Sequence, residues 1–265
     1  MRQTLLCRSL WLLALSSFFS LPVVAAECSA SSGAQTVALL ELYTSEGCSS
    51  CPPADRWLGK LSAQGYSAGR VIPLALHVDY WDYIGWKDRF AQPGFAARQR
   101  EMAGLNHSSL VYTPQVMLNG RDYRSFGSPA RFEADIAAIN RNPARANIQL
   151  ALNQAATDSI EISAAAQAPK QATPVLYLAL YENDLTSTVK AGENSGASLH
   201  HDYVVREWLG PYPVDDKAGV TWRQKIALNP GWKSQDIGAV AFVQSRSSGE
   251  VLQAVALKLC EDVRH

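Results

Sequence analysis

Two cysteines with two residues between them, Cys48 and Cys51, are the side chains in this sequence best suited to chemistry. A Cys-x-x-Cys pair directly behind a strand-like apolar run is typical of a redox site when a β-α-β pattern follows. Backbone N–H groups and the dipole at a helix N-terminus would stabilise a thiolate at Cys48 and make it the attacking sulfur. Cys51 would lie on the same helical face and resolve a mixed disulfide. The alternatives are a structural disulfide and two inert thiols.

Several ionisable side chains near the pair bear on its chemistry. Glu46 and Asp55 would raise the thiol pKa values if their carboxylates lie close, and Arg56 would oppose that effect. His77 is a candidate base for Cys51, although a histidine at the end of a strand is more often packed or hydrogen-bonded. The two serines between the cysteines leave the direction of electron flow open.

The segment around the cysteines has the pattern of an α/β domain. Apolar runs predict strands, the proline pair behind Cys51 suits a first helical turn, and Asn119-Gly120 is a typical hairpin turn. The predicted order is β-α-β-α-β-β-α, with a right-handed crossover that makes the first two strands parallel. The strands cover 36–43, 70–78, 115–118 and 121–126, and the helices cover about 52–65, 95–103 and about 129–139.

This order, with a Cys-x-x-Cys pair after the first strand, resembles the thioredoxin fold over roughly residues 36–141. The resemblance implies that Pro114, in the segment Tyr112-Thr113-Pro114, faces the cysteines. It also implies a cis peptide bond at Thr113-Pro114, although cis is the minority state of X-Pro bonds.

Several stretches of the sequence are also similar to one family of exported bacterial proteins, domain of unknown function 1223. This resemblance implies a thioredoxin-like domain and names no substrate. It is carried by TSEGCSSCPPAD, HVDYWDYIGWKD, ARQR, VYTPQ, NGR and, much later in the chain, GENSGASLHHDYVVREW.

In a thioredoxin-like sheet, three segments would converge at the edge where the first two strands end: 44–51, 77–90 and 107–114. The middle segment is rich in aromatic residues, and we expect it to form one wall of a substrate groove beside Cys48. The alternative is that these rings simply pack under a long loop. The candidate substrate contacts are Thr113, Tyr80, Trp81 and Tyr83.

Behind Asn142-Pro143 the pattern changes to short β-like runs separated by turns. Seven such runs predict a β-sandwich-like domain over 144–265, after a thioredoxin-like domain over 27–143. The segment His200-His201-Asp202 contains metal-ligand residue types, but adjacent strand residues face opposite ways, so we expect no metal site there. The runs are 147–152, 159–163, 175–181, 201–208, 221–228, 239–244 and 251–259.

The first 26 residues have the pattern of a secretory signal peptide: a basic start, an apolar run and the small residues Ala25 and Ala26. A membrane anchor is the alternative, but the run is short for a span of about 20 residues. We therefore expect cleavage after Ala26, a periplasmic or secreted protein, and no stable membrane span afterwards.

Cleavage would leave four cysteines, an even number that suits two disulfides in an oxidising compartment. With Cys48 and Cys51 paired, Cys28 and Cys260 would join the two ends of the mature chain; two unpaired thiols are the alternative. The mature chain would hold 22 basic and 24 acidic residues, which predicts neither a nucleic-acid face nor a polybasic membrane patch.

The leading functional prediction is an exported thiol–disulfide oxidoreductase without a cofactor. Its substrate would be a protein or a small thiol or disulfide, and a second redox partner would restore it. A thiolate carrier for copper, using Cys48, Cys51 and a nearby histidine, is the runner-up. Only Met102 and Met117 remain for soft-metal binding after cleavage, and one Cys-x-x-Cys is too few for structural zinc. A redox-inert binding module is the third interpretation.

Overall fold

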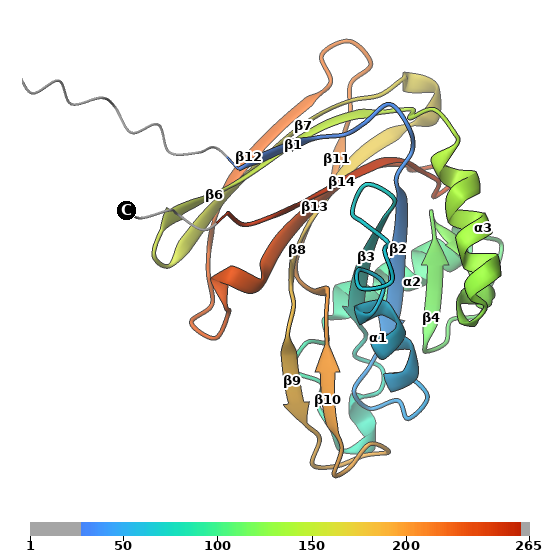
Figure 1. The fold of residues 1–265 in the computed structure, drawn as a ribbon, viewed down its shortest axis with the longest axis vertical. Coiled ribbons are helices and arrows are strands. Elements are labelled where there is room, and N and C mark those ends of the chain that lie inside the picture. The colour runs from blue at the N-terminus through green and yellow to red at the C-terminus, as the bar shows by residue number, and fades with distance from the viewer. Residues whose placement is uncertain (1–27, 261–265) are drawn as a thin grey trace, which may run out of the picture.

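The computed structural model of the protein describes residues 28–260. The signal peptide expected at residues 1–26 lies outside the described residues. In the part of the chain that is described, no helix is both long and apolar enough to cross a membrane. The architecture is mixed α/β, and strands predominate (Figure 1).

The largest sheet, called the central sheet below, has eight strands in the order β14-β13-β8-β11-β3-β2-β4-β5. Strand β2 runs parallel to β3 and antiparallel to β4. Both β2 and β3 are buried along their whole length, which explains why their sequences are almost continuously apolar. The strands are β2 (Ala38–Thr44), β3 (Val71–His77), β4 (Gln115–Leu118), β5 (Arg121–Asp122), β8 (Pro174–Glu182), β11 (Val204–Pro213), β13 (Ile237–Ser245) and β14 (Val251–Lys258).

Three helices of the described chain cover the end of the central sheet that holds β2, β3 and β4 (Figure 1). They are α1 (Pro52–Gly59), α2 (Pro93–Leu105) and α3 (Pro129–Asn140). Each opens with a proline, whose missing N–H costs nothing in a first helical turn. Because side chains alternate along β2, Leu40 and Leu42 pack with α1 and α3, whereas Leu39 and Tyr43 pack with α2.

A second sheet packs against the other end of the central sheet. Its order is β1-β6-β7-β12, with β1 (Ser29–Ser31), β6 (Asn147–Ala156), β7 (Ser159–Gln167) and β12 (Val220–Ala227). Alternating residues of β6 and β7 face β8, β13 and β14 across a shared apolar core. This core includes Ile148, Leu150, Ile162, Leu178 and Ala241.

A separate two-stranded hairpin stands beside α1 and consists of β9 (Leu185–Thr188) and β10 (Ser198–His201) (Figure 1). The sequence predicted a single strand over 201–208 and no hairpin here. The run is interrupted because Tyr203 adopts a positive φ of 57°, which ends β10 and lets β11 begin at Val204.

Two other predicted elements are shorter than expected. Helix α1 ends at Gly59 rather than near residue 65. At its end the N–H of Lys60 bonds to the carbonyl of Trp57, three residues earlier, in a tighter 3₁₀-type turn. The fourth strand covers only β5, and a 3₁₀ turn, η2 (Arg124–Gly127), replaces its second half. The short strand β1 was not predicted.

The boundary expected at Asn142-Pro143 lies between α3 and β6, yet strands from both sides of it belong to the central sheet. The junction is a parallel pair of β3 with β11, at Ala75 and Val204. Strands β2 to β5 therefore form no sheet of their own.

Candidate functional site

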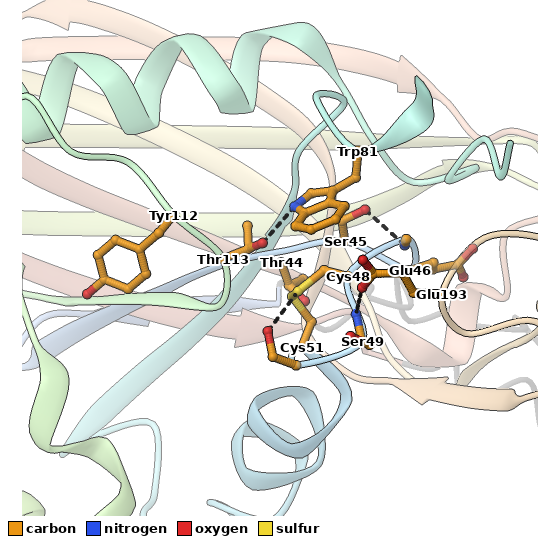
Figure 2. Close-up of a disulfide and its surroundings, with 12 residues drawn as sticks. Thr44, Ser45, Glu46, Cys48, Ser49, Cys51, Trp81, Tyr112, Thr113 and Glu193 are labelled. Atoms are coloured by element: carbon orange, nitrogen blue, oxygen red, sulfur yellow. Dashed lines mark hydrogen bonds between the residues drawn. A yellow bond between two sulfur atoms is a disulfide. The ribbon is translucent and has the colours of Figure 1, made fainter. Parts of the chain in front are cut away.

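The Cys48–Cys51 pair lies in the loop that connects β2 to α1, and the two residues form a disulfide (Figure 2). Cys51 is the N-cap residue of α1, and its carbonyl accepts hydrogen bonds from the N–H groups of Ala54 and Asp55. Cys48 precedes the helix by one turn of chain, and its carbonyl accepts the N–H of Cys51. The spacing of the pair thus places both sulfurs at the positive end of α1.

Both cysteines are covered. Cys48 is 1% exposed and Cys51 is 0% exposed, whereas Ser49 and Ser50 between them face solvent. The hydroxyl of Ser50 lies 3.3 Å from Sγ of Cys48. A substrate sulfur that approaches Cys48 must therefore displace part of its surroundings, which the sequence did not indicate.

The three loop segments expected to converge do meet at the disulfide. Nε1 of Trp81 donates a 2.7 Å hydrogen bond to Oγ1 of Thr113, and Figure 2 shows both side chains beside the cysteines. A Cβ atom at Gly47 would lie 3.1 Å from Cβ of Trp81, so glycine permits this close approach. The Thr113-Pro114 peptide bond is cis, as predicted.

The aromatic residues of segment 77–90 do not all face the disulfide. Tyr80 is half-buried and its hydroxyl donates to Oε1 of Gln99 on α2, while Phe90 is buried in the interior. Tyr83 is 82% exposed. Of the predicted aromatic wall, Trp81 is the member that the structure brings next to Thr113 and the cysteines. The role of these residues as substrate contacts stays a prediction.

A buried ion pair anchors the loop that carries Cys48. Nδ1 of His77 lies 2.6 Å from Oδ2 of Asp88, and the same carboxylate oxygen accepts the N–H of Glu46 at 2.9 Å. Burial alone would raise the pKa of Asp88, but His77 and two backbone N–H groups lower it. Burial would lower the pKa of His77, but Asp88 outweighs it and raises that pKa. The partner of His77 is therefore Asp88. Among the described residues, His77 makes no hydrogen bond to either cysteine.

Glu46 contacts several of the side chains that surround the cysteine loop. Its Oε2 accepts a 2.7 Å hydrogen bond from Nε1 of Trp86, and its Oε1 lies 3.4 Å from Nε2 of the buried His201. Burial would raise the pKa of Glu46, but the neighbouring His201 and the hydrogen bond from Trp86 lower it. Glu46 is thus an ionised carboxylate two residues before Cys48.

Asp55, in the first turn of α1, is the opposite case. Burial raises its pKa, against the lowering effect of the two histidines and of Thr44, whose hydroxyl donates to Oδ2 at 3.1 Å. The structure therefore holds two buried carboxyl groups with opposed pKa shifts on either side of the cysteine pair.

His200 and His201 face opposite ways, as their adjacency in a strand predicted. His200 is exposed and its Nε2 lies 3.3 Å from Asp202, whereas His201 is buried against the rings of His77 and Phe90. Within residues 28–260, no group of three or more ligand-type side chains has the geometry of a metal site.

The tip of the β9–β10 hairpin contacts the cysteine loop directly. The side-chain amide of Asn194 donates to the carbonyls of Glu46 at 2.8 Å and of Cys48 at 3.0 Å. Oε2 of Glu193 accepts the N–H of Ser49 at 3.0 Å, and Figure 2 shows this carboxylate beside the loop. The segment GENSGASLHHDYVVREW stood out in the sequence, but nothing in its local pattern linked it to the cysteines.

A second disulfide joins Cys28 to Cys260, the pair that the sequence analysis favoured. The two cysteines are 232 positions apart in the sequence. This bond connects the segment before β1 with the residues that follow β14.

The family model described as "Protein of unknown function (DUF1223)" matches residues 39–244. The chain belongs to this family. Among solved structures, protein AGR_C_4864 from Agrobacterium tumefaciens is 26% identical, with a TM-score of 0.60, and the match covers 88% of this chain and 99% of that one. HBP35 of Porphyromonas gingivalis shares the fold at 16% identity and a TM-score of 0.67, over 88% of this chain and 79% of that one. A comparison with curated proteins found no match.

Proposed function

We propose that this protein is an exported thiol–disulfide oxidoreductase whose reactive group is the Cys48–Cys51 disulfide. The observation that carries the proposal is the position of this disulfide. It lies at the N-terminus of α1, beside the Thr113-Pro114 segment and at the end of the parallel strands β2 and β3.

The arrangement of residues 36–141 supports this proposal, because it is the arrangement expected of a thioredoxin-like domain. Strands β2 and β3 run parallel, β4 is antiparallel to β2, and helices flank both faces. Export is supported by the signal-like first 26 residues and by the Cys28–Cys260 disulfide, because such bonds persist in oxidising compartments.

The chemistry is a two-electron exchange. A substrate thiolate attacks Sγ of Cys48, the bond to Cys51 breaks, and Cys51 leaves as a thiolate that takes up a proton. A second substrate thiolate then attacks the substrate sulfur of the mixed disulfide and releases Cys48, which takes up the second proton. The substrate dithiol becomes a disulfide and the protein becomes a dithiol. The reverse sequence reduces a substrate disulfide, and a second redox partner restores the starting state.

Equilibration with glutathione buffers of graded composition tests the proposal. After each equilibration, free thiols are alkylated and counted by mass spectrometry, with peptide mapping to separate the two disulfides. We expect one reversible two-electron transition of Cys48–Cys51, which disappears in Cys48→Ser, while Cys28–Cys260 stays oxidised. A pair that never exchanges would contradict the proposal.

A redox-inert binding module is the second candidate, and the burial of both cysteines favours it. Metal analysis of the same samples tests whether the protein is instead a thiolate metal carrier. A stoichiometric metal on the reduced protein without a reversible disulfide would identify a carrier. If the protein neither binds metal nor exchanges its disulfide, the redox-inert binding module is the remaining candidate.

A further inference from the structure

The β9–β10 hairpin places a carboxylate and an amide against the cysteine loop, and their partners lie 144 and 146 positions earlier in the chain. Oε2 of Glu193 accepts the N–H of Ser49, the residue directly behind Cys48, at 3.0 Å. Asn194 donates to the carbonyls on either side of Gly47. Two neighbouring side chains of the hairpin tip thus hold the backbone on both sides of the attacking sulfur.

The contact of Glu193 has an electrostatic consequence for a thiolate at Cys48. A thiolate at a helix N-terminus is stabilised by free N–H groups and by the helix dipole. Glu193 accepts the N–H of Ser49 in the loop before α1, so this N–H is not free for a Cys48 thiolate, and its carboxylate places a negative charge beside Cys48. Its pKa is lowered by the hydrogen bonds from Ser49, so the group is ionised at neutral pH.

The stability of the Cys48 thiolate in the reduced pair affects the equilibrium between disulfide and dithiol. A pair whose reduced form is stabilised as a thiolate is a strong oxidant, and a pair whose thiolate is disfavoured keeps its disulfide. A carboxylate beside Cys48 should therefore make the disulfide harder to reduce.

We propose that the hairpin tip sets the redox balance of the Cys48–Cys51 pair, with Glu193 favouring the disulfide and Asn194 positioning the loop. This inference rests on the proposed oxidoreductase function. In the reaction, a dithiol gives two electrons and two protons to the Cys48–Cys51 disulfide, and Glu193 shifts the equilibrium of that exchange without bonding to sulfur.

Other charged groups also face the cysteine loop, and they stay constant when Glu193 alone is changed. The loop and α1 contribute Glu46 and Asp55, the segment behind β3 contributes Asp88, and β3 and β10 contribute His77 and His201. These five are buried, whereas Glu193 is exposed. Salt therefore screens the effect of Glu193 far more than the effects of the buried groups.

Glu193→Gln tests the inference because the amide keeps an oxygen that can accept the N–H of Ser49 while the charge is lost. The equilibrium constant with glutathione is measured for the Cys48–Cys51 pair at low and high salt. We expect a shift of about two- to fivefold toward the dithiol at low salt, the size of a charge effect at a helix end. The shift should shrink in 1 M salt. The pKa of the Cys48 thiol, followed by thiolate absorbance, should fall in parallel.

Asp158→Asn is the matched control, because it removes one negative charge in the turn between β6 and β7 of the second sheet. It should leave the equilibrium constant unchanged. If the wild type exchanges reversibly and Glu193→Gln has the same equilibrium constant, the inference is wrong and the oxidoreductase function stands. If the wild type does not exchange, both are wrong. A shift of equal size in Asp158→Asn would show that the equilibrium constant responds to the net charge of the protein and not to the position of Glu193. That result would also overturn the inference.

Discussion

At the scale of single residues, the cysteine loop is held by side chains that are themselves buried and paired. Asp88 accepts from both His77 and the N–H of Glu46, so one carboxylate links the end of β3 to the loop before Cys48. Trp81 supplies a second link through Thr113. The geometry around the sulfurs therefore depends on a small number of polar contacts, each of which can be removed separately.

His77→Gln tests the buried ion pair through its pH dependence. Asp88 raises the pKa of His77 above its ordinary 6.5, so the pair contributes full stability below that pH and loses it as pH rises through the folded pKa. Asp88 has a lowered pKa, so its contribution is present above its ordinary 3.8 and is lost as pH falls through its folded value. We expect the wild-type free energy of unfolding to decline above pH 6.5, as measured by urea denaturation.

In His77→Gln that decline should be absent, and at pH 6 the free energy of unfolding should fall by about 3 kcal/mol, because one partner of a buried pair is left alone. An unchanged alkaline decline in the variant would assign the pH dependence to other groups.

Trp81→Phe tests the link to Thr113. The variant keeps an aromatic ring but loses the hydrogen bond from Nε1, which is worth about 1 kcal/mol. We expect the rate of exchange with a peptide disulfide to fall about three- to tenfold, by stopped-flow or alkylation assays. Tyr83→Ser is the control for folding because Tyr83 is 82% exposed, and its unfolding free energy should match the wild type. An unchanged exchange rate in both variants would exclude an aromatic substrate groove.

At the scale of elements, the β9–β10 hairpin is the part that turns an ordinary strand–helix loop into a covered site. The hairpin is a separate two-stranded sheet. His201 on β10 contacts Glu46 from the protein interior. The hairpin tip contacts the cysteine loop through Asn194. Gly192, with a φ of 75°, brings the chain close to Ile84, so the tip also touches segment 77–90.

Asn194→Ala removes two hydrogen bonds from the hairpin to the carbonyls of the loop. We expect the free energy of unfolding to fall by about 1–2 kcal/mol. We also expect faster reduction of Cys48–Cys51 by a small dithiol, because the loop is released from the tip. Ser195→Ala is the control, since Ser195 bonds within the tip, to the carbonyl of Lys190. Equal reduction rates in the two variants would show that the hairpin does not limit access.

At the scale of the whole molecule, the two halves of the chain are joined by hydrogen bonds, charge and a covalent bond. Strand β3 pairs with β11, and the guanidinium of Arg98 on α2, which also donates to Glu41, lies over the ring of Trp208 on β11 at 4.5 Å. Cys28 and Cys260 then close the chain. We therefore expect the described part of the protein to unfold as one unit.

Cys28→Ser with Cys260→Ser tests the covalent closure. The loss of a disulfide between distant residues typically lowers the free energy of unfolding by about 2–4 kcal/mol, largely through the entropy of the unfolded chain. Denaturant unfolding should show this loss in a single transition. The glutathione equilibrium of Cys48–Cys51 should stay unchanged, and two separate transitions in the wild type would contradict a single unit.

Features that depend on near neighbours along the chain could be predicted from the amino-acid sequence. Buried strands β2 and β3 follow from continuous apolar runs, and the helix starts follow from prolines. The even cysteine count suggested a Cys28–Cys260 bond but left two unpaired thiols open. The convergence of Trp81 and Thr113 followed from the order of strands. These signals are local or topological, so periodicity and spacing are enough to find them.

The residues that cover the cysteines and the contacts that join the halves could not be predicted from the sequence. Glu193 and Asn194 reach the loop from about 145 positions away, and no periodic pattern records such a contact. The same holds for the pair of His201 with Glu46 and for the shared central sheet. Such contacts join residues that are distant in the sequence and become neighbours only when the chain folds. For the buried pair of His201 and Glu46, folding must also supply a polar partner for each group, because an unpaired buried polar group is costly.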